Sequence, residues 1–175
     1  MRLRLSLVVS VLGVVLPLAA CQLGGGAASA PAGEAGAKSL LERFLKPGAD
    51  YQALSAPLKP SKADVAAVYQ GDFAGKLAAR YDEMWGKQPL IIKPNAGQTQ
   101  LLLSSATSEE LKAGTGNAGE FPGGYKRVVE HLKPGLTLYR WKFVKPGETL
   151  GMAYDGLVHV NGHWVLLPKP WAAAR

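Results

Sequence analysis

The chain has 175 residues, with 20 Lys or Arg against 13 Asp or Glu, a formal net charge of +7 at pH 7. This length fits a single domain, and the moderate charge lacks the dense basic stripe of a nucleic-acid-binding protein. The one cysteine, Cys21, excludes an intramolecular disulfide and a metal site built on several cysteines. We therefore expect an apolar core to stabilise the fold, without a bound cofactor.

The first 18 residues combine positive charge with a long apolar run. Arg2 and Arg4 precede residues 5–18, which carry no charge, and this order is typical of a secretory signal peptide. As a helix, the apolar run would rise about 21 Å at ~1.5 Å per residue. The hydrocarbon core of a bilayer is roughly 30 Å thick, so a permanent transmembrane span is the poorer interpretation.

The signal segment ends in Leu18-Ala19-Ala20-Cys21. This sequence resembles the lipobox of bacterial lipoproteins. The resemblance implies a diacylglyceryl group on the Cys21 sulfur, cleavage between Ala20 and Cys21, and acylation of the new amino group. Two or three acyl chains hold a protein on a bilayer. The alternative is an ordinary secretory signal followed by an unmodified Cys21.

The lipobox also predicts where the protein works. By resemblance to the enterobacterial sorting rule, Gln22 in place of an aspartate implies the outer membrane, with the protein in the cell envelope and facing the periplasm. Removal of Arg2 and Arg4 with the signal lowers the net charge from +7 to +5. Most of the basic excess follows residue 121, where Lys and Arg outnumber three acidic residues, Glu130, Glu148 and Asp155.

The sequence predicts three segments. Residues 1–20 form the signal peptide, residues 21–38 the lipidated Cys21 and a flexible Gly/Ala-rich tether, and residues 39–175 a single globular domain. The tether is inferred because residues 22–37 have few large apolar side chains with which to pack.

Apolar spacing predicts several helices. One begins near Ser39 and stops at Pro47-Gly48, and a second begins at the N-cap Ser61, with Asp64 three residues on. A third is capped by Asp72 and carries an aromatic stripe that we interpret as core rather than as a ligand site. The stripe consists of Phe73, Leu77, Tyr81, Met84 and Trp85.

The middle of the chain predicts a hairpin and two further helices. The hairpin joins residues 90–92 to 101–103 through Pro94–Gly97. Thr107 and Glu110 match a capping box for a short helix closed by Gly114. The glycine-rich stretch 114–124 lacks the Walker pattern, so we interpret it as a surface loop, and residues 122–132 have the spacing of an amphipathic helix.

The last forty residues predict strands. Tyr139, Trp141 and Phe143 alternate with Arg140 and Lys142, which gives one aromatic face and one basic face. A second strand covers residues 150–160, Asn161-Gly162 forms a type I′ turn, and residues 163–167 return.

The predicted fold is α+β, with helices on one face of a bent antiparallel sheet that ends in a three-stranded meander. Over residues 61–168 this element order resembles the NTF2-like (cystatin-related) cone fold. The resemblance implies an apolar pocket between helices and sheet. Because no family motif matches residue by residue, it assigns no catalytic residue.

Two sets of residues are candidates for a site. The first is a binding face on the strand 136–145, made of Tyr139, Arg140, Trp141 and Lys142. The second is a pocket near Tyr154, Asp155 and His159. Asp155 and His159 are expected on one face of their strand but about 13 Å apart, too far for a direct acid–base dyad.

We expect no metal site. His159 and His163 have zinc-like spacing for a helix, but the two-residue turn between them sends them to opposite faces of a hairpin.

Three functions are compatible with the sequence. The first and favoured hypothesis is a non-catalytic binding or interaction module that is held on the membrane by the lipid anchor. The second is a small NTF2-like hydrolase or isomerase with a pocket near Asp155 and His159. The third is a structural component of the envelope. The partners that we expect are the membrane and either an envelope protein or a small ligand, and not nucleic acid.

Overall fold

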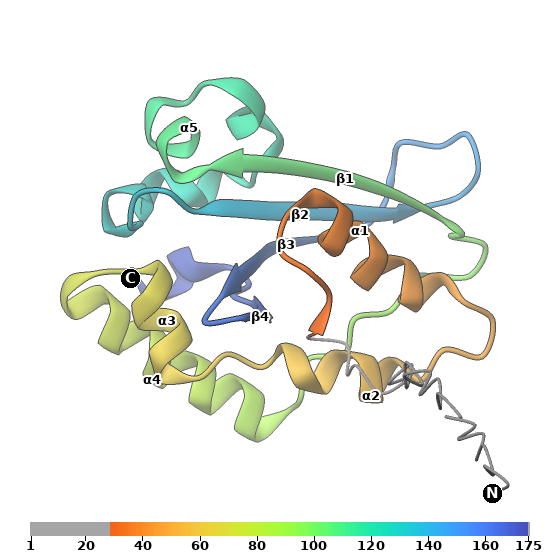
Figure 1. Ribbon diagram of the computed structural model, residues 1–175, viewed down its shortest axis with the longest axis horizontal. Helices are drawn as coiled ribbons and strands as arrows, with labels where there is room; N and C mark the ends of the chain where they lie inside the picture. Colours follow the sequence, from red (N-terminus) through yellow and green to blue (C-terminus); the bar gives the residue numbers. More distant parts are fainter. Residues whose placement is uncertain (1–28, 175) are drawn as a thin grey trace, which may run out of the picture.

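The computed structural model of the protein describes residues 29–174. The predicted signal peptide, the lipobox and Cys21 lie outside the described residues. Figure 1 shows a twisted sheet with helices around it. The helices are α1 (Glu34–Glu42), α2 (Tyr51–Ser55), α3 (Lys62–Val68), α4 (Gly71–Lys87) and α5 (Ser108–Ala113). Short 3₁₀ turns are η2 (Arg43–Leu45), η3 (Ala56–Leu58), η4 (Gly116–Glu120), η5 (Gly123–Arg127), η6 (Val129–His131) and η7 (Pro170–Ala173).

The sheet has four antiparallel strands in the order β1-β2-β3-β4. The strands are β1 (Gln100–Thr107), β2 (Thr137–Val144), β3 (Gly151–Val160) and β4 (His163–Leu166). This confirms the α+β class and the C-terminal meander. Asn161 and Gly162 have φ values of 51° and 81°, as the predicted type I′ turn requires.

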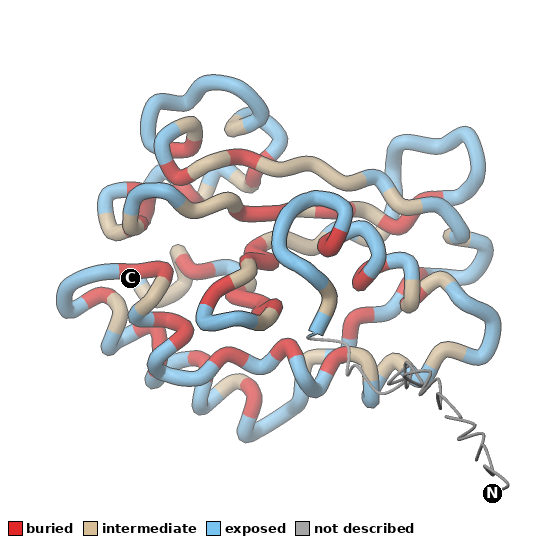
Figure 2. Tube along the Cα trace, viewed as in Figure 1, coloured by how far each residue is buried: buried red, intermediate tan, exposed pale blue. Residues whose placement is uncertain are grey.

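Helices cover both faces of the sheet, so the expectation of helices on one face is wrong. Because side chains alternate along a strand, Leu138 and Val158 face one core, while Trp141 and Leu157 face the other. The first core is covered by α3, α4, α5, η5 and η6 and the second by α1, η2 and α2. Figure 2 shows the buried residues concentrated between these layers.

Two predicted helix starts are confirmed at capping boxes, but the predicted cap at Asp72 is wrong, because Gln70 is the N-cap of α4 and Asp72 lies in its first turn. Ser61 accepts from the Asp64 amide at the start of α3, and Thr107 accepts from the Glu110 amide at the start of α5. The aromatic stripe of α4 is core: Phe73, Leu77, Tyr81 and Trp85 are all buried.

The predicted tether is too long. Helix α1 begins at Glu34, Ala37 is fully buried, and the Trp164 indole donates to the carbonyls of Ala30 (2.8 Å) and Pro31 (3.2 Å). The folded domain therefore starts before residue 39. Composition was misleading because small residues can pack by close approach: a Cβ on Gly36 would collide with the Pro31 carbonyl.

The predicted hairpin at residues 90–103 does not form, because β1 pairs with β2 instead. Residues 90–99 lie outside the sheet and include a turn in which the Gln98 amide donates to the Asn95 carbonyl (3.1 Å). Before this turn, side chains bond the backbone. The Ile92 amide donates to Ser55 Oγ (2.9 Å) and the Lys93 amide donates to Tyr154 Oη (3.0 Å). Backbone groups outside a sheet need hydrogen-bond partners, but side chains can supply these in place of a neighbouring strand.

The predicted helix at residues 122–132 is two 3₁₀ turns, η5 and η6. Its apolar residues are still buried, but Val128, at φ −130° and ψ −4°, interrupts any continuous helix. Two glycines at its start, Gly123 and Gly124, also disfavour an α-helix.

A β-bulge in β3 reverses the faces to which the side chains of its second half point. Tyr139 pairs with Leu157 and Arg140 with Asp155, so Gly156 is the extra residue. Gly156 has φ +87°, and a Cβ there would lie 2.2 Å from the Leu167 carbonyl oxygen. The bulge therefore requires glycine, and it places Asp155 and Leu157 on opposite faces. The expectation that Asp155 and His159 share a face is wrong for this reason.

Candidate binding groove along the edge strand

Strand β1 forms one edge of the sheet, and within residues 29–174 no segment pairs with its outer side. Its sequence, Gln100 to Thr107, contains no charged residue and no proline, and its pairing with β2 runs through without a bulge. Edge strands are usually protected by a charge, a proline, a bulge or a covering segment. Strand β1 has no charge, proline or bulge, and α1 and η4 lie beside it, so the backbone groups that stay open to another chain lie in the groove between these two elements.

The direction of the backbone groups along β1 follows from one hydrogen bond. The Ser108 amide donates to the carbonyl of Leu136, the position directly opposite in the β1–β2 register (2.9 Å). In an antiparallel ladder, alternate residues direct both backbone groups to the same neighbour. The N–H and C=O groups of Leu101, Leu103 and Ser105 therefore point away from β2.

One of these outward residues already has a partner. Asn117 in η4 donates from its amide to the Ser105 carbonyl (3.0 Å). In the part of the chain that the structure describes, the outward groups of Leu101 and Leu103 bond to nothing. The available edge is thus the stretch from Gln100 to Ser104.

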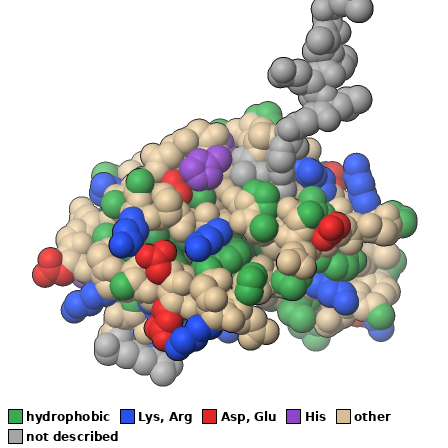
Figure 3. Space-filling view, turned by 90° about the horizontal axis from the view of Figure 1, so that it is seen from below, with side chains coloured by type: hydrophobic (Ala, Val, Ile, Leu, Met, Phe, Trp, Pro, Cys, Tyr) green, Lys and Arg blue, Asp and Glu red, His purple; other side chains and the backbone are tan. Residues whose placement is uncertain are grey.

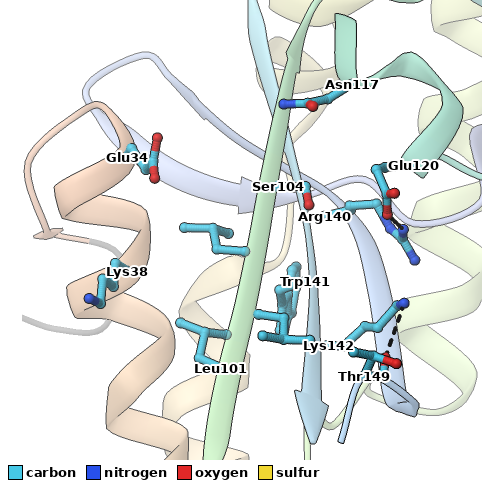
Figure 4. Close-up of a pocket in the computed structure, with 12 residues that line it drawn as sticks. Glu34, Lys38, Leu101, Ser104, Asn117, Glu120, Arg140, Trp141, Lys142 and Thr149 are labelled. Atoms are coloured by element: carbon cyan, nitrogen blue, oxygen red, sulfur yellow. Dashed lines mark hydrogen bonds and ion pairs between the residues drawn. The ribbon is translucent and has the colours of Figure 1, made fainter. Parts of the chain in front are cut away.

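A cavity of about 670 Å³ opens along this edge. Figure 4 shows β1 crossing it, with α1 on one side and β2 on the other. Its charged and polar wall consists of Glu34, Lys38, Ser104, Asn117, Glu120, Arg140, Lys142 and Thr149. A second cavity of about 420 Å³ continues toward the start of β1, where Lys38 and Glu42 stand beside Leu101 and Leu102.

The groove contains charges of both signs. The Arg140 guanidinium, only 13% exposed, bonds Glu120 at 2.9 Å, and the Lys142 ammonium donates to the Thr149 carbonyl at 3.3 Å. Lys38 and Glu42 lie 3.9 Å apart on the exposed side of α1. Charged side chains of both signs are also interspersed on the lower face in Figure 3. The site therefore suits a partner with matched charges better than a strongly acidic one.

The structure separates the residues of the predicted binding face. Arg140 and Lys142 line the groove from one face of β2. Trp141, which is 1% exposed, lines it from the other face, and Tyr139, which is 4% exposed, does not line it. The two aromatic residues pack under α1. The alternation was predicted correctly, but the aromatic face is buried in the core that α1 shares, and of its residues only Trp141 borders the groove.

The structure does not bring the predicted pocket residues together. Tyr154 Oη donates to the Lys93 carbonyl and its ring stacks on Trp141. The His159 ring meets Trp164 edge to face. Asp155, beyond the bulge, lies on the other face and accepts from Tyr125 Oη at 3.2 Å.

Asp155 belongs to a polar cluster inside the core that the sequence did not predict. Burial raises the pKa of Asp155, although the hydrogen bond from Tyr125 opposes the rise. Burial also raises the pKa of three nearby tyrosines, Tyr69, Tyr81 and Tyr125. Asp155 lines neither of the cavities along β1. The carboxyl group is half-buried and accepts a hydrogen bond from Tyr125.

A second unpredicted cluster joins the β3–β4 turn to α3. The buried carboxylate of Asp64 accepts from the Ser61 amide and hydroxyl and from the Asn161 amide (2.8 Å), and His163 Nε2 lies 3.3 Å away. Burial acts to raise the pKa of Asp64, but the hydrogen bonds from Ser61 and Asn161 outweigh it and lower the pKa. The capping box was visible in the sequence, whereas the contact with Asn161 depends on tertiary packing.

The two β-hairpin histidines lie as predicted. His159 pairs with Trp164 and His163 with Val160, on opposite faces of the sheet. Within residues 29–174, no group of three or more His, Cys, Asp or Glu side chains could hold a metal ion. Among the described helices, none has the length and apolar character to cross a membrane.

Comparison with protein-family models, with curated proteins and with solved structures finds no match to this chain.

Proposed function

We propose that the chain is a lipid-anchored protein of the bacterial cell envelope, on the outer membrane and facing the periplasm, that acts as a non-catalytic interaction module. The anchor rests on the order of Arg2, Arg4, the apolar run and Leu18 to Cys21. The module rests on one observation, the stretch of the outer edge of β1 from Gln100 to Ser104 that no described strand pairs with and that lies inside an open groove.

The edge explains how such a protein can bind without a deep pocket. An added strand gains main-chain hydrogen bonds from the edge, and its alternate side chains contact the walls of the groove. Here those walls are α1 on one side and Arg140, Lys142 and η4 on the other. A binding surface of this kind needs neither a nucleophile nor a general base.

The enzyme alternative has less support. It requires Tyr154, Asp155 and His159 around one pocket, and the bulge at Gly156 separates Asp155 from the other two. The raised pKa of Asp155 has a structural cause in burial beside Tyr125. A purely structural component remains a distinct hypothesis, because it would leave the groove without a binding partner.

The anchor is tested by intact-mass analysis of the protein extracted from membranes. We expect a mature chain that begins at Cys21 and carries the added mass of its acyl chains. Cys21→Ser should remain unprocessed and unacylated. The matched control is Cys21→Ser with Ser29→Cys, which restores a thiol without a lipobox before it. An unmodified Cys21 in the wild-type chain refutes the anchor.

The module is tested by a photo-activatable amino acid in place of Leu102, in the full-length chain in cells. Leu102 is 40% exposed on β1, and Leu150, which is 79% exposed, serves as the control position. We expect a discrete crosslinked product from position 102 and not from position 150. The absence of any product from position 102 contradicts the binding role and favours the structural alternative.

A further inference from the structure

We propose that a cavity between α5 and the turns η4, η5 and η6 binds a small apolar carboxylate, that is, a molecule with an apolar body and a single negative charge. The volume of the cavity is about 650 Å³, which lies within the range of small-molecule sites. Among the described residues, this cavity and the groove along β1 share no lining residue. The site is therefore additional to the proposed interaction surface and does not depend on it.

Turn η4 forms the wall between this cavity and the groove. Figure 1 shows α5 and the turns after it at the end of β1. Asn117 and Glu120 of η4 line the groove. The two residues between them, Ala118 and Gly119, line the cavity. A ligand in the cavity would thus contact the side of η4 that faces away from β1.

The floor of the cavity is apolar and already in place. It consists of four side chains that are at most 7% exposed: Leu111, Phe121, Tyr125 and Val129. The rings of Phe121 and Tyr125 meet edge to face, with centroids 5.4 Å apart. Tyr125 is held by two residues outside the cavity lining, because its Oη donates to Asp155 and its ring packs against Trp171. An apolar ligand therefore finds a floor that needs no rearrangement, and its burial there is favourable.

Three glycines leave the walls of the cavity open. Gly114, Gly119 and Gly123 line it, and a Cβ added to any of them would meet no described atom within 4 Å. Glycine allows a ligand to approach the backbone closely, because no side chain stands in the way. These positions leave room for the body of a ligand above the apolar floor.

The exposed rim of the cavity has an excess of one positive charge. Lys112 on α5 and Lys126 on η5 line it, together with a single acid, Glu130 on η6. Within residues 29–174, none of these three side chains forms an ion pair. Glu109 interacts electrostatically with Lys112, but its carboxylate accepts from the Gly135 amide at 2.8 Å. One carboxylate on the ligand would neutralise the excess charge, which favours a monoanion over a neutral or doubly charged molecule.

The test uses the full-length chain in nanodiscs of phosphatidylcholine, a lipid without net charge, so that no detergent competes for the cavity. The probe is 2-naphthoate, and 2-naphthamide is its neutral control with the same apolar body. Binding is followed by the ¹³C-methyl NMR signals of Leu111 and Val129 in the floor. We expect 2-naphthoate to shift both signals with a dissociation constant of about 1 mM or below, while the methyl signals of Leu102 stay unchanged.

Replacing the two lysines tests the charge of the rim without altering the core. Lys112→Met and Lys126→Met should each raise the dissociation constant of 2-naphthoate about two- to fivefold, because each removes one exposed ion pair with the carboxylate. In the double variant the preference for 2-naphthoate over 2-naphthamide should be lost. Lys76→Met is the matched control, since Lys76 is exposed on α4 and lies outside the cavity lining.

Filling the cavity tests its location. Ala118→Phe places a ring in the cavity from η4 and should abolish the shifts, whereas Ala153→Phe, at an exposed position of β3, should leave them unchanged. The proposal is overturned if 2-naphthoate shifts neither Leu111 nor Val129. It is also overturned if the amide binds as tightly as the carboxylate, or if the double lysine variant keeps the wild-type affinity. None of these results alters the expected crosslinking from Leu102, so the cavity and the interaction module can fail separately.

Discussion

The bulge at Gly156 determines which residues of β3 face which core, so replacing this glycine should be costly. An alanine at φ +87° is disfavoured by about 1–2 kcal/mol, because L residues clash with their own backbone there. The new Cβ would also lie 2.2 Å from the Leu167 carbonyl oxygen. Leu167 cannot easily move, because its amide donates to the Gly156 carbonyl at 2.8 Å.

Overpacking of this kind adds about 1–3 kcal/mol, so Gly156→Ala should lower the free energy of unfolding by roughly 2–5 kcal/mol. The assay is urea unfolding followed by tryptophan fluorescence. Gly162→Ala isolates the backbone contribution: its φ is +81°, and among the described atoms none lies within 4 Å of the added Cβ. It should cost only about 1–2 kcal/mol. If Gly156→Ala costs no more than Gly162→Ala, the close approach at the bulge is wrong.

Three further predictions concern single side chains. Thr107→Ala removes the acceptor of the Glu110 amide and should cost about 1 kcal/mol in urea unfolding; an unchanged midpoint would contradict the cap. The pKa of Asp64 is lowered in the folded protein, so its carboxylate stabilises the fold at pH values above 3.8, the ordinary pKa of the group. This stability is lost as the pH falls through the folded-state pKa, so Asp64→Asn should flatten the acid side of the stability profile. The pKa of Asp155 is raised in the folded protein, so stability is lost as the pH rises from 3.8 through the folded-state pKa. Asp155→Asn can still accept the hydrogen bond from Tyr125 and should be more stable than wild type at pH 7. A lower stability of Asp155→Asn at pH 7 would refute this direction.

The local signals were the most predictable part of the fold. Capping at Ser61 and Thr107, the stripe of α4 and the turn at Asn161-Gly162 depend on neighbours within a few residues, and all are present. Strand pairing was less predictable. The apolar runs 90–92 and 101–103 satisfy the same pattern, but only the second finds a strand, because pairing with β2 depends on the tertiary fold.

The candidate site was predictable only in part. Arg140 and Lys142 were identified from alternation, but α1, which covers Tyr139 and Trp141, begins in a segment whose small residues suggested a tether. The bulge could not be inferred either. A glycine within a strand is compatible with a bulge, yet the approach of Leu167 that fixes it comes from β4 and the residues beyond. The role of β1 as an edge follows from strand order, which alternation does not contain.

Photo-crosslinking from Leu102 in cells shows directly whether the anchored protein uses the outer edge of β1 to bind. The full-length chain is used, so that both the membrane attachment and the fold contribute. We expect one discrete crosslinked product from Leu102 in the membrane fraction and none from Leu150. No product from Leu102, in a chain shown to be folded and present in the membrane, would contradict it.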